Sequence, residues 1–176
     1  MTRAAQILVV IATSLWLGGL VALFLFVGAL FGHDRTIAIQ AAPPLFNVFA
    51  KYQLLVGLIG LIALFFWQAS YARTPWTIVI MALLALSLAL AAYVTFSVIP
   101  EMEAIRIAGQ SGDSPRFKTL HGRSMIFYSS QTIAMLLAAM MLPSAITASA
   151  RRARTGIESD PARDSPVATA DRVAVR

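Results

Sequence analysis

The stretch ILVVIATSLWLGGLVALFLFVGALF, residues 7–31, contains no charged side chain and decides the fold of this protein. A helix rises about 1.5 Å per residue, so about 20 such residues cross the roughly 30 Å hydrocarbon core of a bilayer. Only helices and closed barrels satisfy their backbone polar groups in lipid, and the run lacks the alternation of a barrel strand. It is also about twice as long as the apolar core of a signal peptide. The run therefore predicts a retained membrane-spanning helix.

Three more apolar runs, at residues 45–70, 76–99 and 124–148, are long enough to cross a bilayer in the same way. The chain is 59% hydrophobic and 12% charged, whereas a soluble domain carries about 25% charged residues. A small soluble fold leaves much of its surface exposed and cannot hide so many apolar side chains. The sequence predicts an all-α fold, a four-transmembrane-helix bundle in residues 1–148. Residues 149–176 are basic and poor in large apolar side chains, so we expect a disordered C-terminal tail there.

The charge and the motif content of the chain exclude several classes of function. The net charge is +6, but the arginines flank the apolar runs or lie in the tail, where lipid head groups explain them better than nucleic acid does. The absence of cysteine excludes a disulfide framework and a thiolate metal site. No H-E-x-x-H, Walker or G-x-S-x-G motif occurs. We therefore expect neither an enzyme nor a bound cofactor.

Basic residues predict the orientation of the protein in the membrane. Four crossings place both termini on one side, and there Arg151, Arg152 and Arg154 follow the last apolar run directly. Such a dense basic cluster favours the cytoplasm. The opposite side also carries basic residues, namely Arg35, Lys51, Arg106, Arg116, Lys118 and Arg123. We expect cytoplasmic termini and an integral protein of the bacterial inner membrane.

A polar stripe runs along the start of the fourth apolar run. His121, Ser124, Tyr128 and Gln131 are spaced three, four and three residues apart and therefore share one face of a helix. Unsatisfied polar groups facing lipid would cost several kcal/mol, so this face should point inward. The third run carries Tyr93, Ser97 and Glu101 on one face, toward the stripe. The sequence predicts a polar binding site at the membrane face below the two longer loops, built from His121, Ser124, Tyr128, Gln131, Glu101, Ser97, Lys51 and Arg106.

Structural alternatives stay open for these residues. Glu101 can form an ion pair with Lys51 or Arg106, and Gln131 can form a hydrogen bond between helices. Charged side chains at a helix end also extend to the lipid head groups. Two less favoured alternatives are a haem held by His33 and His121, and a soft metal ion held by Met102, Met125 and His121.

Small residues at helical spacing predict where the helices pack, because they let backbones approach closely in lipid. The sets are Ser14, Gly18 and Ala22 with Gly19 alongside in the first run, Gly57 and Gly60 in the second, Ala82, Ala85, Ala89 and Ala92 in the third, and Ala134 with Ala138 in the fourth.

Four segments resemble the TMEM205-like, or DUF4149, family of membrane proteins. They are LWLGGLVALFLF (residues 15–26), AAPPLFNVFAKYQ (41–53), VIPEMEAIR (98–106) and FKTLHGRSMIFY (117–128). The likeness covers roughly residues 7–145, and its most specific part is Phe117 with the following His-Gly-x-Ser. The resemblance implies a four-helix membrane fold with a site near the entry to the fourth helix. Tyr128 stands where the family often has Asn, so a role that requires an amide there does not carry over.

The resemblance also bears on function, since the eukaryotic relative is associated with resistance to platinum drugs and with membrane traffic. It implies handling of ions or amphiphiles. The leading hypothesis is a small non-enzymatic membrane protein that transports, exports or binds a solute or ion. The alternatives are an assembly partner of a membrane complex, a homo-oligomer or, less favoured, a haem- or copper-binding protein.

Overall fold

The computed structural model describes residues 2–70, 73–109 and 114–158, and its regular elements there are all helical. One of them, η1, is a five-residue π-helix that joins α3 to α4 without a break, so these three elements make one rod. The elements in order are α1 (Thr2–His33), α2 (Arg35–Ser70), α3 (Pro75–Tyr93), η1 (Val94–Val98), α4 (Ile99–Ile107) and α5 (Pro115–Glu158).

Four helical segments of the described chain are long and apolar enough to span a membrane: Arg3–His33, Arg35–Ser70, Pro75–Ile107 and Pro115–Ala153. Large apolar side chains cover the outside of these rods, as the exposure of Leu25, Phe96 and Met140, each about 70%, illustrates. Such a surface suits lipid and would be unfavourable in water. The prediction of an all-α fold with four membrane-spanning helices is confirmed, and the chain is a multi-pass membrane protein.

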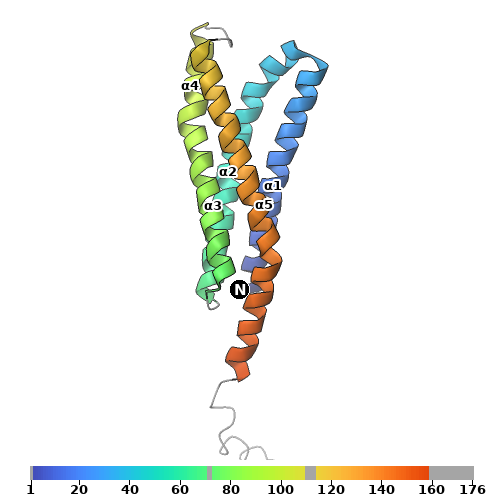
Figure 1. The fold of residues 1–176 in the computed structure, drawn as a ribbon, viewed down its shortest axis with the longest axis vertical. Helices are drawn as coiled ribbons and strands as arrows, with labels where there is room; N and C mark the ends of the chain where they lie inside the picture. The colour runs from blue at the N-terminus through green and yellow to red at the C-terminus, as the bar shows by residue number, and fades with distance from the viewer. Residues whose placement is uncertain (1, 71–72, 110–113, 159–176) are drawn as a thin grey trace, which may run out of the picture.

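The four rods are arranged as two antiparallel pairs. α1 packs mainly on α2, and α5 packs mainly on α3. Figure 1 shows the two pairs close together toward the N-terminal end of α1 and diverging toward the other end, where α1 turns into α2. The end of α4 and the start of α5 lie at this same diverging end. The deep interior of the bundle therefore lies in the half where the pairs meet.

Two helix starts lie earlier than the sequence predicted. α2 begins at Arg35 and passes through Pro43 and Pro44, although a break was expected there. The Asp34 carboxylate accepts hydrogen bonds from the backbone N–H groups of Thr36 (2.7 Å) and Ile37 (3.3 Å), and so caps the early start. α5 begins at Pro115 instead of 124, because a proline at the first helical position is favourable.

The end of α5 corrects the predicted start of the tail. Residues 149–158 were expected to be disordered, but the helix continues to Glu158. This segment is rich in Ala and Arg, which are strong helix formers, so it extends the helix beyond the apolar run. The rest of the predicted tail, residues 159–176, lies outside the described residues.

Close packing between α1 and α2 depends on two predicted glycines. A Cβ atom on Gly57 would lie 2.6 Å from Cζ3 of Trp16, and one on Gly60 would lie 3.1 Å from Cβ of Ala12. Ala134 and Ala138 on α5 are buried as well. For these residues the predicted packing is confirmed.

Two other predicted packing faces are wrong. On α1, Ser14, Gly18 and Ala22 are exposed, and no atom lies within 4 Å of a Cβ built on Gly18; only Gly19 beside them is in contact, since its Cβ would lie 3.0 Å from Cε2 of Phe49. On α3 the alanines at 82, 85 and 89 are exposed and Ala92 is half-buried, whereas the buried side chains are Thr77, Ile80, Leu84, Ser87 and Ala91. Every face of these helices is apolar, so small size alone does not show which face meets a neighbour.

Candidate functional site

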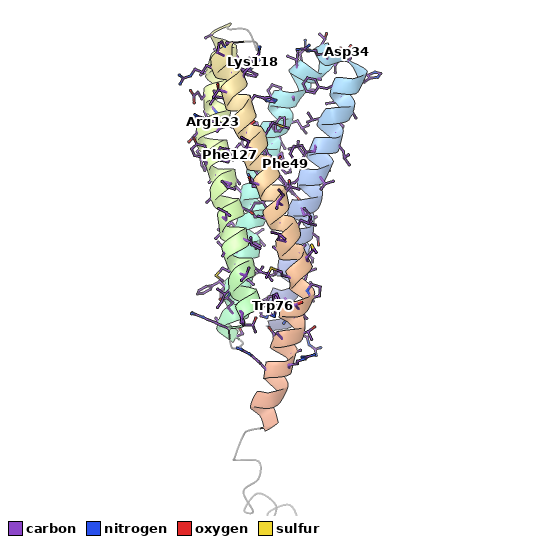
Figure 2. All side chains as sticks on the ribbon, in the orientation of Figure 1. Asp34, Phe49, Trp76, Lys118, Arg123 and Phe127 are labelled. Atoms are coloured by element: carbon purple, nitrogen blue, oxygen red, sulfur yellow. The ribbon has the colours of Figure 1, made fainter. Side chains whose placement is uncertain are left out.

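The predicted stripe on α5 points inward over most of its length. Ser124, Tyr128 and Gln131 are buried, and Gln131 is completely inaccessible. His121 is exposed and stacks on Phe117, with ring centroids 6.3 Å apart and planes 5° apart. It lies three residues beyond Lys118, which Figure 2 shows near the tip of its helix pair, and the adjacent Leu120 takes the buried position at this level. The inward face expected for His121 is therefore corrected, while that of the other three is confirmed.

The Tyr128 ring is held by aromatic side chains from the opposite helix pair. The ring centroids of Phe24, Phe46 and Phe49 lie 6.5, 5.7 and 6.3 Å from that of Tyr128. Aromatic pairs at such distances pack favourably. One turn earlier, the Ser124 hydroxyl donates to the His121 carbonyl at 2.7 Å, so its donor is satisfied within its own helix. Tyr128 is therefore the point at which α5 meets both α1 and α2.

The face predicted on the third rod does not reach the stripe. Ser97 is exposed, and Tyr93 is 45% exposed and packs edge-on against Phe127 with centroids 5.2 Å apart. The cause is η1, because a π turn bonds residue i to i+5 and shifts the faces that a regular helix would align. A spacing of 3.6 residues per turn therefore does not predict which side chains share a face across residues 94–98.

The charged residues of the predicted site form ion pairs at the diverging end. Arg116 pairs with the half-buried Glu101, donating from its Nε at 2.8 Å. Arg106 pairs with Glu103, its neighbour one turn away, at 2.5 and 2.9 Å. Neither predicted partner of Glu101 is the one observed, and Lys51 is exposed.

The two loops of this end belong to separate helix pairs. Figure 2 shows Asp34 at the tip of one pair and Lys118 near the tip of the other. The charged groups thus lie at the same end of the bundle, as expected, but on two separate helix pairs. Whether any of them binds a solute stays a prediction.

A second set of polar side chains lies deep between the helices. Nine buried side-chain nitrogen or oxygen atoms in the described chain have no hydrogen-bond partner. One is Nε1 of Trp67, ten residues beyond Gly57 in α2. The other eight belong to six residues, which we call the interior polar cluster: Thr13 and Trp16 of α1, Gln53 of α2, Ser87 of α3, and Tyr128 and Gln131 of α5.

Contacts between the helices place several members of this cluster close together. The Cβ position of Gly57 lies beside both Trp16 and Leu88, and Leu88 directly follows Ser87. Gln53 is four residues, about 6 Å, from Gly57 along α2. Its side chain lies close enough to the Tyr128 hydroxyl to interact, although no hydrogen-bond geometry is met.

Gln131 lies at the same depth as the other cluster residues. It is three residues, about 4.5 Å, beyond Tyr128 along α5, which runs in the same direction as α2. The cluster residues therefore all lie within the apolar parts of the four rods, between the helix pairs.

The chemistry of the interior polar cluster is uncharged. The carboxamides of Gln53 and Gln131 and the hydroxyls of Thr13, Ser87 and Tyr128 can each donate and accept hydrogen bonds, and the indole of Trp16 can donate one. No Asp, Glu, Lys, Arg or His side chain is buried among the residues with described burial. The arrangement is suited to hydrogen bonding with a neutral group and offers no counter-charge for an ion.

Sequence reasoning found Tyr128 and Gln131 but missed the other four members. A signal for Gln53 existed, because it lies four and seven residues before Gly57 and Gly60 and so shares their packing face. A polar side chain on such a face of a membrane helix is a candidate site residue. Thr13 and Ser87 had no such signal, since hydroxyls also satisfy themselves on their own helix.

The geometry does not bring together the two histidines that the haem alternative requires, while the soft-metal alternative with Met102, Met125 and His121 stays a prediction. The described residues contain no group of three or more His, Cys, Asp or Glu side chains that could hold a metal ion. His33 and His121 are both exposed and belong to different helix pairs.

Comparison with protein-family models, with curated proteins and with solved structures gave no match for this chain.

Proposed function

We propose that this protein is a non-enzymatic, solute-handling membrane protein that binds a small uncharged solute at the interior polar cluster. The observation that carries the proposal is the set of eight buried polar atoms without partners, contributed by α1, α2, α3 and α5. Buried polar groups normally find hydrogen-bond partners, and leaving them unpaired in an apolar interior is costly. A solute with donors and acceptors would pair with them. The likeness to TMEM205-like proteins supports the same class of function.

The solute is neutral in this proposal because the cluster is neutral. An ion at the centre of the bilayer requires an opposite charge or several strong dipoles. Gln53 and Gln131 face the interior from opposite helix pairs and can each donate and accept. We assign them the main contacts with the solute, and Tyr128 an adjoining one.

Access to the cluster would come from the diverging end. The helix pairs separate in that direction (Figure 1), and the rings of Phe24, Phe46 and Phe49 meet Tyr128 between that end and Gln131. With the orientation that we propose, cytoplasmic termini in a bacterial inner membrane, this end faces away from the cytoplasm. A small separation of the two pairs would uncover the cluster.

The proposal is tested by solute flux into proteoliposomes, with urea and glycerol as probes and stopped-flow light scattering as the measurement. Liposomes with the wild-type protein should take up one or both probes faster than empty liposomes. Gln131→Leu and Gln53→Leu should return the flux to that of empty liposomes. Leucine keeps the volume and removes a buried unpaired amide, so both variants should still fold.

The matched control is Gln40→Leu, which changes an exposed residue of α2 outside the cluster. It should keep wild-type flux at equal protein content. Wild-type flux equal to that of empty liposomes for both probes, or unchanged flux in both cluster variants, would contradict the proposal.

A second candidate function is assembly with another membrane helix. It is favoured by the exposed stripe of Ser14, Gly18 and Ala22 on α1, because small residues allow close helix contact in lipid. Crosslinking in native membranes should then give a discrete higher-mass species that Gly18→Leu removes. A monomer throughout would exclude this candidate.

A further inference from the structure

A surface depression lies at the end of the bundle opposite the diverging loops, between the start of α3 and the last turns of α5. Its volume is about 580 Å³, and it is lined by Trp76, Pro143, Ser144, Thr147, Ala148, Arg151 and Arg152. Figure 2 shows Trp76 in this lower part of the molecule, far from Asp34. The depression shares no residue with the interior polar cluster and does not rest on the proposed function.

One edge of the depression is strongly basic. Arg151 and Arg152 are exposed there, and Arg152 donates from Nη1 to the backbone carbonyl of Arg73 at 2.6 Å. This bond fastens the end of α5 to the segment before α3, and it brings Arg73 to the same edge. The acidic side chains that the structure describes, those of Asp34, Glu101 and Glu103, belong to the opposite end. Among the side chains that the structure describes, the charged ones at this edge are therefore all basic.

The remainder of the depression is apolar and continues into the membrane-spanning part. Pro143 and Ala148 lie in the last turns of the apolar run at residues 124–148, and Trp76 opens the run at 76–99. The two arginines follow the apolar run directly. A tryptophan beside arginines marks the level of the lipid head groups. The depression thus spans the boundary between head groups and acyl chains.

We infer that this depression is a binding site for an anionic phospholipid. The guanidinium groups of Arg151 and Arg152 bind the phosphate, which their planar donor geometry matches in a bidentate manner. The adjoining part of an acyl chain lies over Pro143, Ala148 and the Trp76 ring. A zwitterionic lipid brings its own cationic group to the same arginine edge and binds less well. The basic edge would also draw this end of the protein toward the anionic cytoplasmic leaflet.

The experiment measures lipid binding to the full-length protein in detergent by native mass spectrometry. The probes are phosphatidylglycerol and phosphatidylcholine with identical acyl chains. Phosphatidylglycerol should bind the wild-type protein more tightly. Arg151→Gln with Arg152→Gln should weaken that binding about 30-fold, which is the factor expected for two basic groups at an anionic lipid. Binding of phosphatidylcholine should not change.

The matched control is Arg35→Gln with Arg123→Gln, which removes two exposed arginines toward the diverging end and should keep wild-type affinity for phosphatidylglycerol. Because Arg152 also holds the end of α5, Ser144→Phe provides a second test, filling the depression while keeping both arginines. It should weaken phosphatidylglycerol binding without lowering the melting temperature.

Three results would overturn the inference. One is wild-type affinity for phosphatidylglycerol in the double arginine variant. Another is equal binding of the two lipids by the wild-type protein. The third is complete displacement of phosphatidylglycerol by millimolar inorganic phosphate, which would assign the site to a free anion instead of a lipid.

Discussion

Gly57 shows how a single residue sets the distance between two helices of this protein. Its Cα faces the ring of Trp16, which is almost completely buried, and a Cβ atom there would lie 2.6 Å from one ring carbon and 2.7 Å from another. The Leu88 side chain closes the same space from α3 at 3.0 Å. Hence α1, α2 and α3 all meet at a position where only hydrogen fits.

We predict that Gly57→Ala lowers the free energy of unfolding by about 1–3 kcal/mol, the usual cost of inserting a methyl group into a packed core. The helix propensity of alanine opposes this by no more than about 1 kcal/mol. Reversible unfolding in mixed detergent micelles gives the measurement.

The control for this prediction is Gly18→Ala, because no atom lies within 4 Å of a Cβ built on Gly18. That variant should be as stable as the wild type or slightly more so. Equal stability of both variants would mean that α1 and α2 are not in contact at Trp16.

The sequence predicted the burial of some residues of the candidate site correctly and that of others wrongly. Tyr128 and Gln131 were found because polar residues at helical spacing stand out in an apolar run. His121 obeys the same spacing yet is exposed, whereas the adjacent Leu120 is buried. Spacing shows which residues share a face, but neighbours decide whether that face is covered.

At the scale of one element, α3 begins with a reciprocal pair of threonines. The Thr77 backbone N–H donates to the Thr74 hydroxyl, and the Thr74 backbone N–H donates to the Thr77 hydroxyl, each at 3.2 Å. Both residues are buried, and Gln68 of α2 donates to the Thr77 carbonyl at 2.9 Å. The start of α3 is thereby fixed against the end of α2.

We predict that Thr74→Ala lowers the free energy of unfolding by about 1 kcal/mol, as is typical for loss of an N-terminal capping side chain. The melting temperature in detergent should fall accordingly. Thr119→Ala is the control, because the exposed Thr119 hydroxyl only donates to the Pro115 carbonyl of its own helix. An equal effect of both substitutions would contradict a capping role for Thr74.

The element η1 explains why the predicted face of the third rod was wrong. Tyr93, Ser97 and Glu101 share a face only in an uninterrupted α-helix, and the π turn at residues 94–98 intervenes. Pro100 follows within the first turn of α4, where its missing N–H does no harm. Pro100 indicated that the helix is disturbed here. The direction in which the side chains of this segment point depended on the packing of η1 against its neighbours.

At the scale of the whole molecule, four crossings separate the two ends of the bundle across the membrane. The turn from α1 to α2, the end of α4 and the start of α5 share one end, while the start of α3 and the last turns of α5 share the other. The native chain contains no cysteine, so single introduced cysteines report position without background labelling.

We predict that Thr36→Cys and Thr119→Cys react with an impermeant maleimide in intact spheroplasts, whereas Arg73→Cys reacts only in inverted vesicles. All three residues are exposed, so a lack of labelling reflects the membrane and not burial. Labelling of residues 36 and 119 from opposite sides would contradict the four crossings. Reversal of all three patterns would reverse the proposed orientation and leave the fold unchanged.

The amino-acid sequence by itself determined the number of membrane-spanning helices, their approximate positions and the all-α fold. These follow from a local requirement, since each apolar run must satisfy its own backbone hydrogen bonds in lipid whatever its neighbours are. For the same reason, the ends of the helices were less well determined. Residues 35–44 and 149–158 are helical because of capping and helix propensity, outside the part that lipid dictates.

Only the tertiary structure decided which side of each helix is covered. In water, burial follows polarity, but here the surroundings of the bundle are as apolar as its interior, so hydropathy does not distinguish the two. Ala82, Ala85 and Ala89 of α3 therefore face outward, while Ser87 on the same helix faces inward. The interior polar cluster joins residues from four helices, and only the packing of those helices brings Gln53 and Gln131 to one depth.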